Sequence, residues 1–141
     1  MRVAGLFMLA LLATAVAVAG EAGEPLAPEL AGRWTVLAPN GTTYIDVFAL
    51  RFEGPLAPGT VRGRLTHRGI TCGAKDEPFE GAWDGRVLRF EVDLKANANT
   101  RTTSPCAAPH TIYVLERKSP ELYEGTITNT AGTHGTLRAA P

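Results

Sequence analysis

The sequence predicts an all-β fold, specifically an eight-stranded antiparallel up-and-down meander closed into a barrel. Three observations support this. Short segments with an apolar residue at every second position recur along the chain, turn-forming Gly, Pro, Asn and Asp residues separate them, and no useful length shows helical apolar spacing. Such alternation is typical of half-buried strands, and short connections favour a closed meander. A two-sheet β-sandwich uses the same pattern and is the alternative.

The clearest strands lie in residues 79–94, FEGAWDGRVLRFEVDL. Apolar or small residues alternate with polar ones on both sides of the dipeptide Asp84-Gly85. An Asp-Gly pair between alternating strands predicts a tight hairpin in which both central residues have positive φ. We therefore expect the fourth and fifth strands here.

The remaining strands follow from the same alternation. We expect them at residues 32–38, 43–52 and 60–67 before the hairpin, and at 111–117, 122–129 and 133–138 after it. Glycines on the inner faces, as in Val61-Gly63-Leu65, predict tight bends or rings packed over the strand. If Phe52 pairs with Val61, the register places Asp46 opposite His67 on the inner face.

The N-terminal residues predict export. A positive start and a short apolar run ending in small residues make residues 1–19 a signal peptide, so we expect a secreted or periplasmic protein. Residues 20–29, rich in Pro, Ala and Glu, predict a flexible arm, and residues 30–141 a single barrel domain without a transmembrane segment. The 14 basic and 14 acidic side chains balance, which gives no reason to expect a nucleic-acid partner.

The two cysteines, Cys72 and Cys106, lie just outside the two ends of the hairpin. An oxidising compartment favours a disulfide between them, which would stabilise the fold by about 4 kcal/mol in the chain-entropy description. In an up-and-down meander both fall in the two longest loops, which lie at the same end of the barrel.

The first predicted strand, LAGRWTV, resembles that of the calycin group, which includes lipocalins, avidins and bacterial inhibitors of secreted metalloproteases. The group is marked by Gly-x-Trp on the first strand and a basic residue on the last strand that packs over the tryptophan. Gly32 and Trp34 match the first feature, and Arg138 is placed for the second. The resemblance implies a structural Trp34–Arg138 pair at the closed end and a ligand-binding mouth at the opposite, loop-rich end.

Candidate ligand-binding residues follow from the inner faces of the strands. They are Tyr44, Asp46, Phe48, His67, Trp83 and Phe90. An inward Asp46–His67 pair could hydrogen-bond a ligand. No metal site is expected, because the three histidines lack ligand spacing. No catalytic residues are expected either, because no nucleophile–base or paired-carboxylate motif is present.

The sequence therefore predicts a small exported binding protein without a cofactor and without enzymatic activity. Its ligand would be a small apolar or amphipathic molecule at the loop-rich mouth. The alternatives are an inhibitor of an exported protease acting through the N-terminal arm, and a ligand-free structural protein of the cell envelope.

Overall fold

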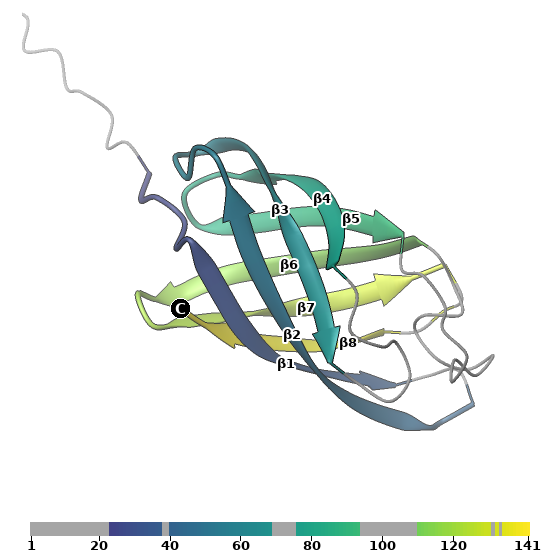
Figure 1. Ribbon diagram of the computed structural model, residues 1–141. Coiled ribbons are helices and arrows are strands. Elements are labelled where there is room, and N and C mark those ends of the chain that lie inside the picture. Colours follow the sequence, from purple (N-terminus) through teal and green to yellow (C-terminus); the bar gives the residue numbers. More distant parts are fainter. Residues whose placement is uncertain (1–22, 38–39, 69–75, 94–109, 131, 133) are drawn as a thin grey trace, which may run out of the picture.

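The computed structural model of the protein describes residues 23–37, 40–68, 76–93, 110–130, 132 and 134–141. Eight antiparallel strands close into one barrel, in which each strand pairs with the next and β8 pairs with β1 (Figure 1). They are β1 (Glu29–Leu37), β2 (Thr43–Glu53), β3 (Gly59–Arg68), β4 (Asp76–Trp83), β5 (Val87–Asp93), β6 (His110–Ser119), β7 (Leu122–Asn129) and β8 (His134–Ala140). The predicted barrel is confirmed, and the sandwich is excluded because the sheet has no open edge between β1 and β8.

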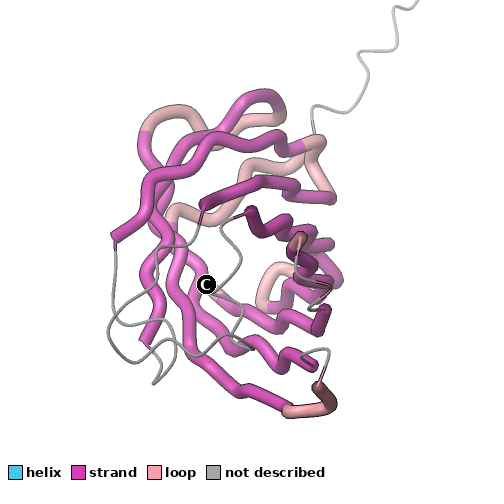
Figure 2. Tube along the Cα trace, turned by 90° about the vertical axis from the view of Figure 1, so that its right-hand side faces the viewer, coloured by secondary structure: helices cyan, strands magenta, loops and turns pink. Residues whose placement is uncertain are grey.

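The barrel has two different ends. The connections β1–β2, β3–β4, β5–β6 and β7–β8 share the loop-rich end, which has the two longest connections, and β2–β3, β4–β5 and β6–β7 share what we call the hairpin end (Figure 1). The strands wrap around a common interior between these ends (Figure 2). Every inward face carries the alternating residues that the sequence predicts, because successive side chains of a strand point to opposite faces.

Aromatic side chains fill that interior. Phe79 and Phe90 stack at a centroid distance of 4.2 Å, and Phe90 stacks on Tyr113 at 4.6 Å. Phe52 meets Phe79 edge-on at 5.8 Å. Phe90 and Tyr113 are at most 1% exposed, and Phe79 and Phe52 are 6% and 9% exposed. Side chains from β4, β5 and β6 therefore meet in the centre of the barrel.

Gly63 makes room for this packing. A Cβ at this position would lie 2.8 Å from the ring Cζ of Phe79 and 2.6 Å from the carbonyl oxygen of Arg51. The expectation that an inner-face glycine lets a ring pack over the strand is confirmed here.

The register between β2 and β3 differs from the expected one by two residues. Phe52 pairs with Gly63 rather than Val61, and His67 pairs with Phe48 rather than Asp46. The last β2–β3 pair is Glu53–Arg62, so the first three residues of β3, 59–61, extend past the paired part of β2 and pair only with β4. A shift of two residues preserves which side chains point inward, so only the expected cross-strand partners were wrong.

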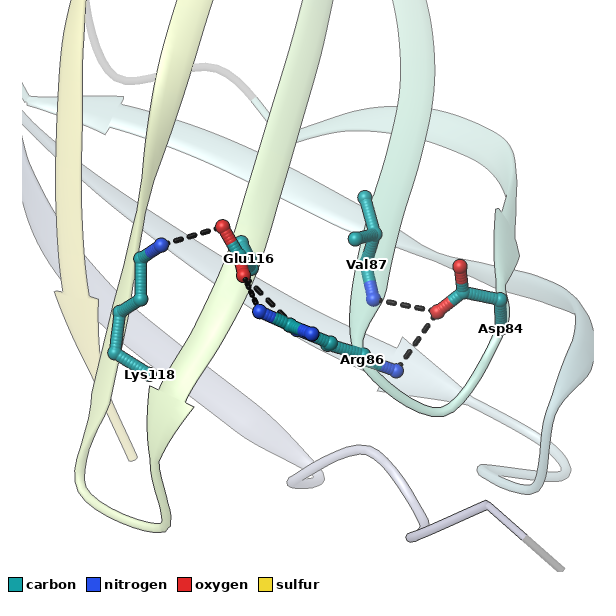
Figure 3. Close-up of polar contacts among 5 residues, drawn as sticks. All are labelled: Asp84, Arg86, Val87, Glu116 and Lys118. Carbon is teal, nitrogen blue, oxygen red and sulfur yellow. Dashed lines mark hydrogen bonds and ion pairs between the residues drawn. The ribbon is translucent and has the colours of Figure 1, made fainter.

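The β4–β5 turn also differs from the expected one. Only Gly85 of the expected Asp84-Gly85 pair has a positive φ, at 98°, and no described non-glycine residue has one. Asp84 Oδ1 instead accepts hydrogen bonds from the backbone N–H groups of Arg86, at 2.8 Å, and Val87, at 2.6 Å (Figure 3). These bonds, the one from Val87 first, lower the pKa of the Asp84 carboxyl. The side chain of aspartate thus shapes a three-residue connection.

Ion pairs join this turn to the neighbouring strand. Glu116 on β6 accepts hydrogen bonds from Arg86 and from Lys118 (Figure 3). The bond from Lys118, followed by that from Arg86, lowers the pKa of the Glu116 carboxyl. The hairpin end is therefore held by polar contacts on its outer surface.

The segment before β1 packs against the hairpin end and inserts one side chain into the core. Leu26 is 2% exposed, and its N–H donates to the carbonyl oxygen of Leu56 at 2.8 Å. Trp83 Nε1 donates to the carbonyl oxygen of Glu24 at 2.8 Å, and the Glu24 carboxylate pairs with Arg117. The expectation of a flexible arm over residues 20–29 is therefore wrong for residues 23–28, because Leu26 is part of the hydrophobic core.

Replacing Leu26 by alanine tests this anchor. Leu26→Ala should lower the free energy of unfolding by about 2–4 kcal/mol, because it removes a buried aliphatic side chain and leaves a cavity. Leu37→Ala is the matched control, because Leu37 is 41% exposed, and should change stability by less than about 0.5 kcal/mol. Urea denaturation followed by tryptophan fluorescence measures both. Equal, small effects would contradict a stabilising role for the segment.

Candidate ligand-binding site at the loop-rich end

Buried polar side chains gather inside the barrel toward the loop-rich end. Asp46, His67, Glu77 and Thr111 are each at most 6% exposed, and all four lie near strand ends on that side. A buried polar group is costly unless it is hydrogen-bonded. This cluster is therefore the part of the interior where chemistry other than packing is concentrated.

His67 is the centre of the cluster. Its ring stacks on Trp34 of β1 at a centroid distance of 4.6 Å, and its Nε2 lies 3.3 Å from the hydroxyl oxygen of Tyr113 on β6. Burial lowers the pKa of His67 from 6.5 to about 4 because the apolar surroundings disfavour the charged ring. His67 is therefore neutral at physiological pH.

Tyr113 is fully enclosed beside it. Burial first, and then the negative charge of Asp46, raise the pKa of the Tyr113 hydroxyl well above its ordinary value. The hydroxyl therefore keeps its proton at physiological pH. Where that proton is donated to His67 Nε2, the neutral imidazole carries its own proton on Nδ1 and can donate from there.

Among the described residues, three buried side-chain atoms in or beside the cluster have no hydrogen-bond partner. They are Trp34 Nε1, His67 Nδ1 and Thr111 Oγ1. Two are ring nitrogens that can donate, and the third is a hydroxyl that can donate or accept. Together they offer donors to an acceptor such as a carbonyl oxygen, whereas the nearby Asp46 makes the environment unfavourable for an anion.

The predicted site residues divide between this cluster and the core. Asp46 and His67 belong to the cluster, and Tyr44 is partly buried near its rim. Phe48 and Phe90 are 1% exposed and belong to the packed core. Neighbouring side chains cover both rings, and their expected role as ligand contacts remains a prediction.

Trp83 lies at the opposite end of the barrel. Its Nε1 is bonded to the Glu24 carbonyl and its ring packs near Tyr123, at a centroid distance of 6.4 Å. It is at the C-terminal end of β4, next to the β4–β5 turn. The expectation that Trp83 contacts a ligand at the loop-rich end is therefore wrong.

The expected Trp34–Arg138 pair is not formed. Trp34 points inward and is 1% exposed, whereas the side chain of Arg138 is 73% exposed and its Nε lies 4.0 Å from Glu124 Oε1. Leu137 and Ala139 occupy the inward positions on β8. Arg138 must therefore point outward, because neighbouring residues of a strand face opposite sides.

Tyr113, Thr111 and Glu77 were not predicted as site residues, because Thr111 and Tyr113 were assigned only to a strand and Glu77 fell in the connection before the expected fourth strand. Strand alternation could have indicated their direction. Thr111 and Tyr113 lie an even number of residues from the inward Leu115, and Glu77 lies two residues from the inward Phe79, so all three side chains point inward. What alternation could not reveal was that Tyr113 meets His67 from across the barrel, because β3 and β6 do not pair.

The histidines do not converge on a metal site. His110 lies at the surface, where its Nε2 is 2.9 Å from Glu91 Oε2, and His134 is exposed. Within the described residues, no group of three or more His, Cys, Asp or Glu side chains is arranged to hold a metal ion. In the same part of the chain, no helix is both long and apolar enough to cross a membrane.

No protein-family model matches the chain, and no curated protein matches it significantly. Among solved structures it is similar to a redesigned β-barrel, with 15% sequence identity and a TM-score of 0.47. The similarity covers 79% of this chain and 88% of that one. The closed antiparallel barrel is established by the strand pairing of the protein itself, and similarity at this level says nothing about its function.

The burial of His67 makes stability depend on pH. A histidine whose pKa falls from 6.5 unfolded to about 4 folded binds a proton more readily when unfolded, so its contribution is present above pH 6.5 and lost as pH falls toward 4. The full shift corresponds to about 3 kcal/mol. We therefore expect the urea concentration at the unfolding midpoint to decrease as the pH is lowered from about 7 to about 5.

Two variants test this assignment. His67→Phe should remove most of the pH dependence in that window, and the exposed control His134→Gln should leave it unchanged. The lowered pKa values of Asp84 and Glu116 act at lower pH, where carboxyls titrate. If His67→Phe kept the pH dependence of the native protein, His67 would not be its cause.

The Cys72–Cys106 disulfide remains a prediction, because both cysteines lie outside the described residues. We expect native protein purified without reductant to take up no iodoacetamide until it is reduced. The double variant Cys72→Ser/Cys106→Ser should be less stable by about 4 kcal/mol, because it frees a loop in the unfolded chain. Alkylation of both cysteines in the unreduced protein would disprove the bond.

Proposed function

We propose that the chain is a small exported binding protein with a calycin-like barrel, which takes a small amphipathic ligand at the loop-rich end. The ligand's polar group, an uncharged acceptor such as a carbonyl, would reach Trp34, His67 and Thr111. Its apolar part would lie above the strands, because the interior is already filled by aromatic side chains. This is a shallower site than the deep cavity that the calycin resemblance implies.

The observation that carries the proposal is the set of unpartnered atoms Trp34 Nε1, His67 Nδ1 and Thr111 Oγ1. Leaving a buried donor unsatisfied costs about 1–3 kcal/mol. The three atoms belong to three strands, β1, β3 and β6, and lie toward the same end of the barrel. A ligand acceptor that approaches from the loop-rich end would satisfy donors that the protein itself does not pair.

The resemblance to calycins gives weaker support. Gly32 and Trp34 keep their expected relation, since Trp34 is an inward residue of the first strand. Arg138 departs from the family pattern, because it points away from Trp34. The proposal therefore rests on the buried cluster, and the family likeness only makes a ligand-binding barrel a familiar use of this architecture.

The protease-inhibitor hypothesis has no specific observation in its favour. Residues 23–28 of its proposed inserting arm are bound to the hairpin end through Leu26 and Glu24. The hypothesis of a ligand-free envelope protein makes the opposite forecast for the experiment below, because it expects no bound molecule.

Native mass spectrometry of the exported protein from its natural host tests the proposal, together with the isosteric variant Thr111→Val. Thr111→Val should leave the free protein equally stable or slightly more stable, because it removes an unsatisfied hydroxyl. It should lower the affinity for the bound molecule about tenfold, because it deletes one hydrogen bond. Thr126→Val, exposed on β7, is the control and should change neither quantity.

The two readouts separate a binding defect from a folding defect. Weaker binding by a fully stable Thr111→Val protein would support a ligand-contacting role. Repeated absence of a bound molecule, or an affinity that Thr111→Val leaves unchanged, would reject the proposal and favour the ligand-free alternative.

A further inference from the structure

The outer face of β8, β1 and β2 carries two arginines on neighbouring strands. Arg33 of β1 lies directly opposite Arg138 of β8, and both side chains point outward. Like charges at directly opposite positions of neighbouring strands are destabilising, because their Cβ atoms are only about 4.5–5.5 Å apart. The free protein thus holds two cations together without an evident structural gain.

Arg138 forms a long ion pair with Glu124, its opposite residue on β7, with 4.0 Å between Arg138 Nε and Glu124 Oε1, whereas Arg33 makes no ion pair within the described residues. Arginines on the other faces form shorter ion pairs. The shortest atom-to-atom separations are 2.8 Å for Arg62–Glu80, 3.5 Å for Arg64–Glu53 and 3.3 Å for Arg89–Glu91. Arg51 is exposed and likewise makes no ion pair with a described residue, but it lies farther along β2, opposite Glu29 and Arg64, in a different hollow.

The two arginines line a surface groove of about 900 Å³, which we call the Arg33–Arg138 groove. The outward side chains of β1 and β8 that line it are small, namely those of Ala31, Thr35, Thr136 and Ala140. Val47 lies on one side and Leu122 on the other. The one acidic residue that lines the groove, Glu121, is in the β6–β7 turn at the hairpin end.

Exposed aliphatic side chains continue from this groove toward the loop-rich end. Among the described residues, the exposed large hydrophobic side chains are Leu37, Ile45 and Val47, with exposures of 41%, 64% and 47%. All three lie on the outer face of β1 and β2. Val47 pairs with Arg33, and Ile45 pairs with Thr35. Cationic and apolar surface are therefore continuous on one face.

We propose that the Arg33–Arg138 groove binds a dispersed anionic amphiphile, a carboxylate or phosphate that carries an apolar chain. The two guanidinium groups would hold the anionic group by charge-assisted hydrogen bonds. The chain would lie over Val47 toward Ile45, where it covers aliphatic surface that is otherwise in water. The bound anion would also relieve the repulsion between the arginines.

Other occupants fit these features less well. A second copy of the chain would bring the same two arginines to the interface, where like charges disfavour association. A flat bilayer surface would leave the anion-binding part of a concave groove poorly filled. The groove lies outside the barrel, so this proposal stands independently of the ligand cluster around His67.

Titration with decanoate below its critical micelle concentration tests the proposal on the full exported protein. Amide chemical shifts in NMR spectra locate the site, and calorimetry gives the affinity. We expect shifts on β1, β2 and β8, and a loss of about tenfold in affinity for each of Arg33→Ala and Arg138→Ala, since each removes charge-assisted bonds. Val47→Ser should cause a smaller loss.

Matched controls separate the groove from general electrostatics and from the interior cluster. Arg51→Ala removes another unpaired, exposed arginine and should leave the affinity unchanged, as should Thr111→Val. Decanol, which has the chain without the charge, and inorganic phosphate, which has the charge without the chain, should both bind at least tenfold more weakly.

Several results would overturn the proposal. They are equal binding by decanol or phosphate, equal losses in Arg51→Ala, or shifts confined to the loop-rich end. Binding only to phosphatidylglycerol vesicles would make the face a membrane-docking surface instead. A dimer in light scattering that Ile45→Ser dissociates would assign the face to self-association.

Discussion

The packing of aromatic rings in the centre of the barrel is the interaction on which the rest of the structure depends. Trp34, His67, Tyr113, Phe90, Phe79 and Phe52 form a continuous set of ring contacts from the loop-rich half toward the hairpin half. They come from six different strands. Each ring covers its neighbours, so strands that do not pair through their backbones are joined through the interior, which excludes a deep ligand cavity within the described strands.

The two ends of the filled barrel differ in the polarity of their buried side chains. At the hairpin end, Leu26 completes the core, and the Glu24 carbonyl accepts the Trp83 indole N–H. The polar side chains of the interior are instead concentrated toward the loop-rich end, where Trp34 retains an unpartnered indole N–H. The two tryptophans therefore report the difference directly, since the same donor is satisfied at one end and unsatisfied at the other.

Local alternation in the sequence was enough to predict the strands and the direction of nearly every side chain. It was not enough to predict cross-strand partners. The β2–β3 register was wrong by two residues, a shift that leaves inward and outward faces unchanged and so leaves no trace in the hydrophobic pattern. The turn at Asp84 was wrong for a related reason. A short polar side chain can satisfy backbone donors itself, and the dipeptide alone does not say whether it will.

The candidate site could be predicted only in part. Asp46 and His67 stood out as polar residues on apolar faces, but the approach of Tyr113 to His67 depends on closure of the whole sheet. The error at Arg138 has another origin. The family resemblance assigned it to the tryptophan, whereas its own neighbours Leu137 and Ala139 already required it to face outward. Where a resemblance and the strand alternation disagreed, the alternation was correct, because steric parity holds for every strand.

Both proposed sites contain polar groups whose hydrogen-bonding or electrostatic needs are not fully met by other groups of the free protein. Inside the barrel, neutral donors lack acceptors, and on the outside, Arg33 and Arg138 lie opposite each other with only the long Arg138–Glu124 ion pair beside them. The two needs are chemically distinct. Asp46 lies beside the Tyr113 hydroxyl in the interior and disfavours an anion there, whereas the arginines of the groove require one. A carboxylate amphiphile should therefore prefer the outer groove, and an uncharged carbonyl compound the loop-rich end, so the charge of a ligand alone discriminates between the two surfaces.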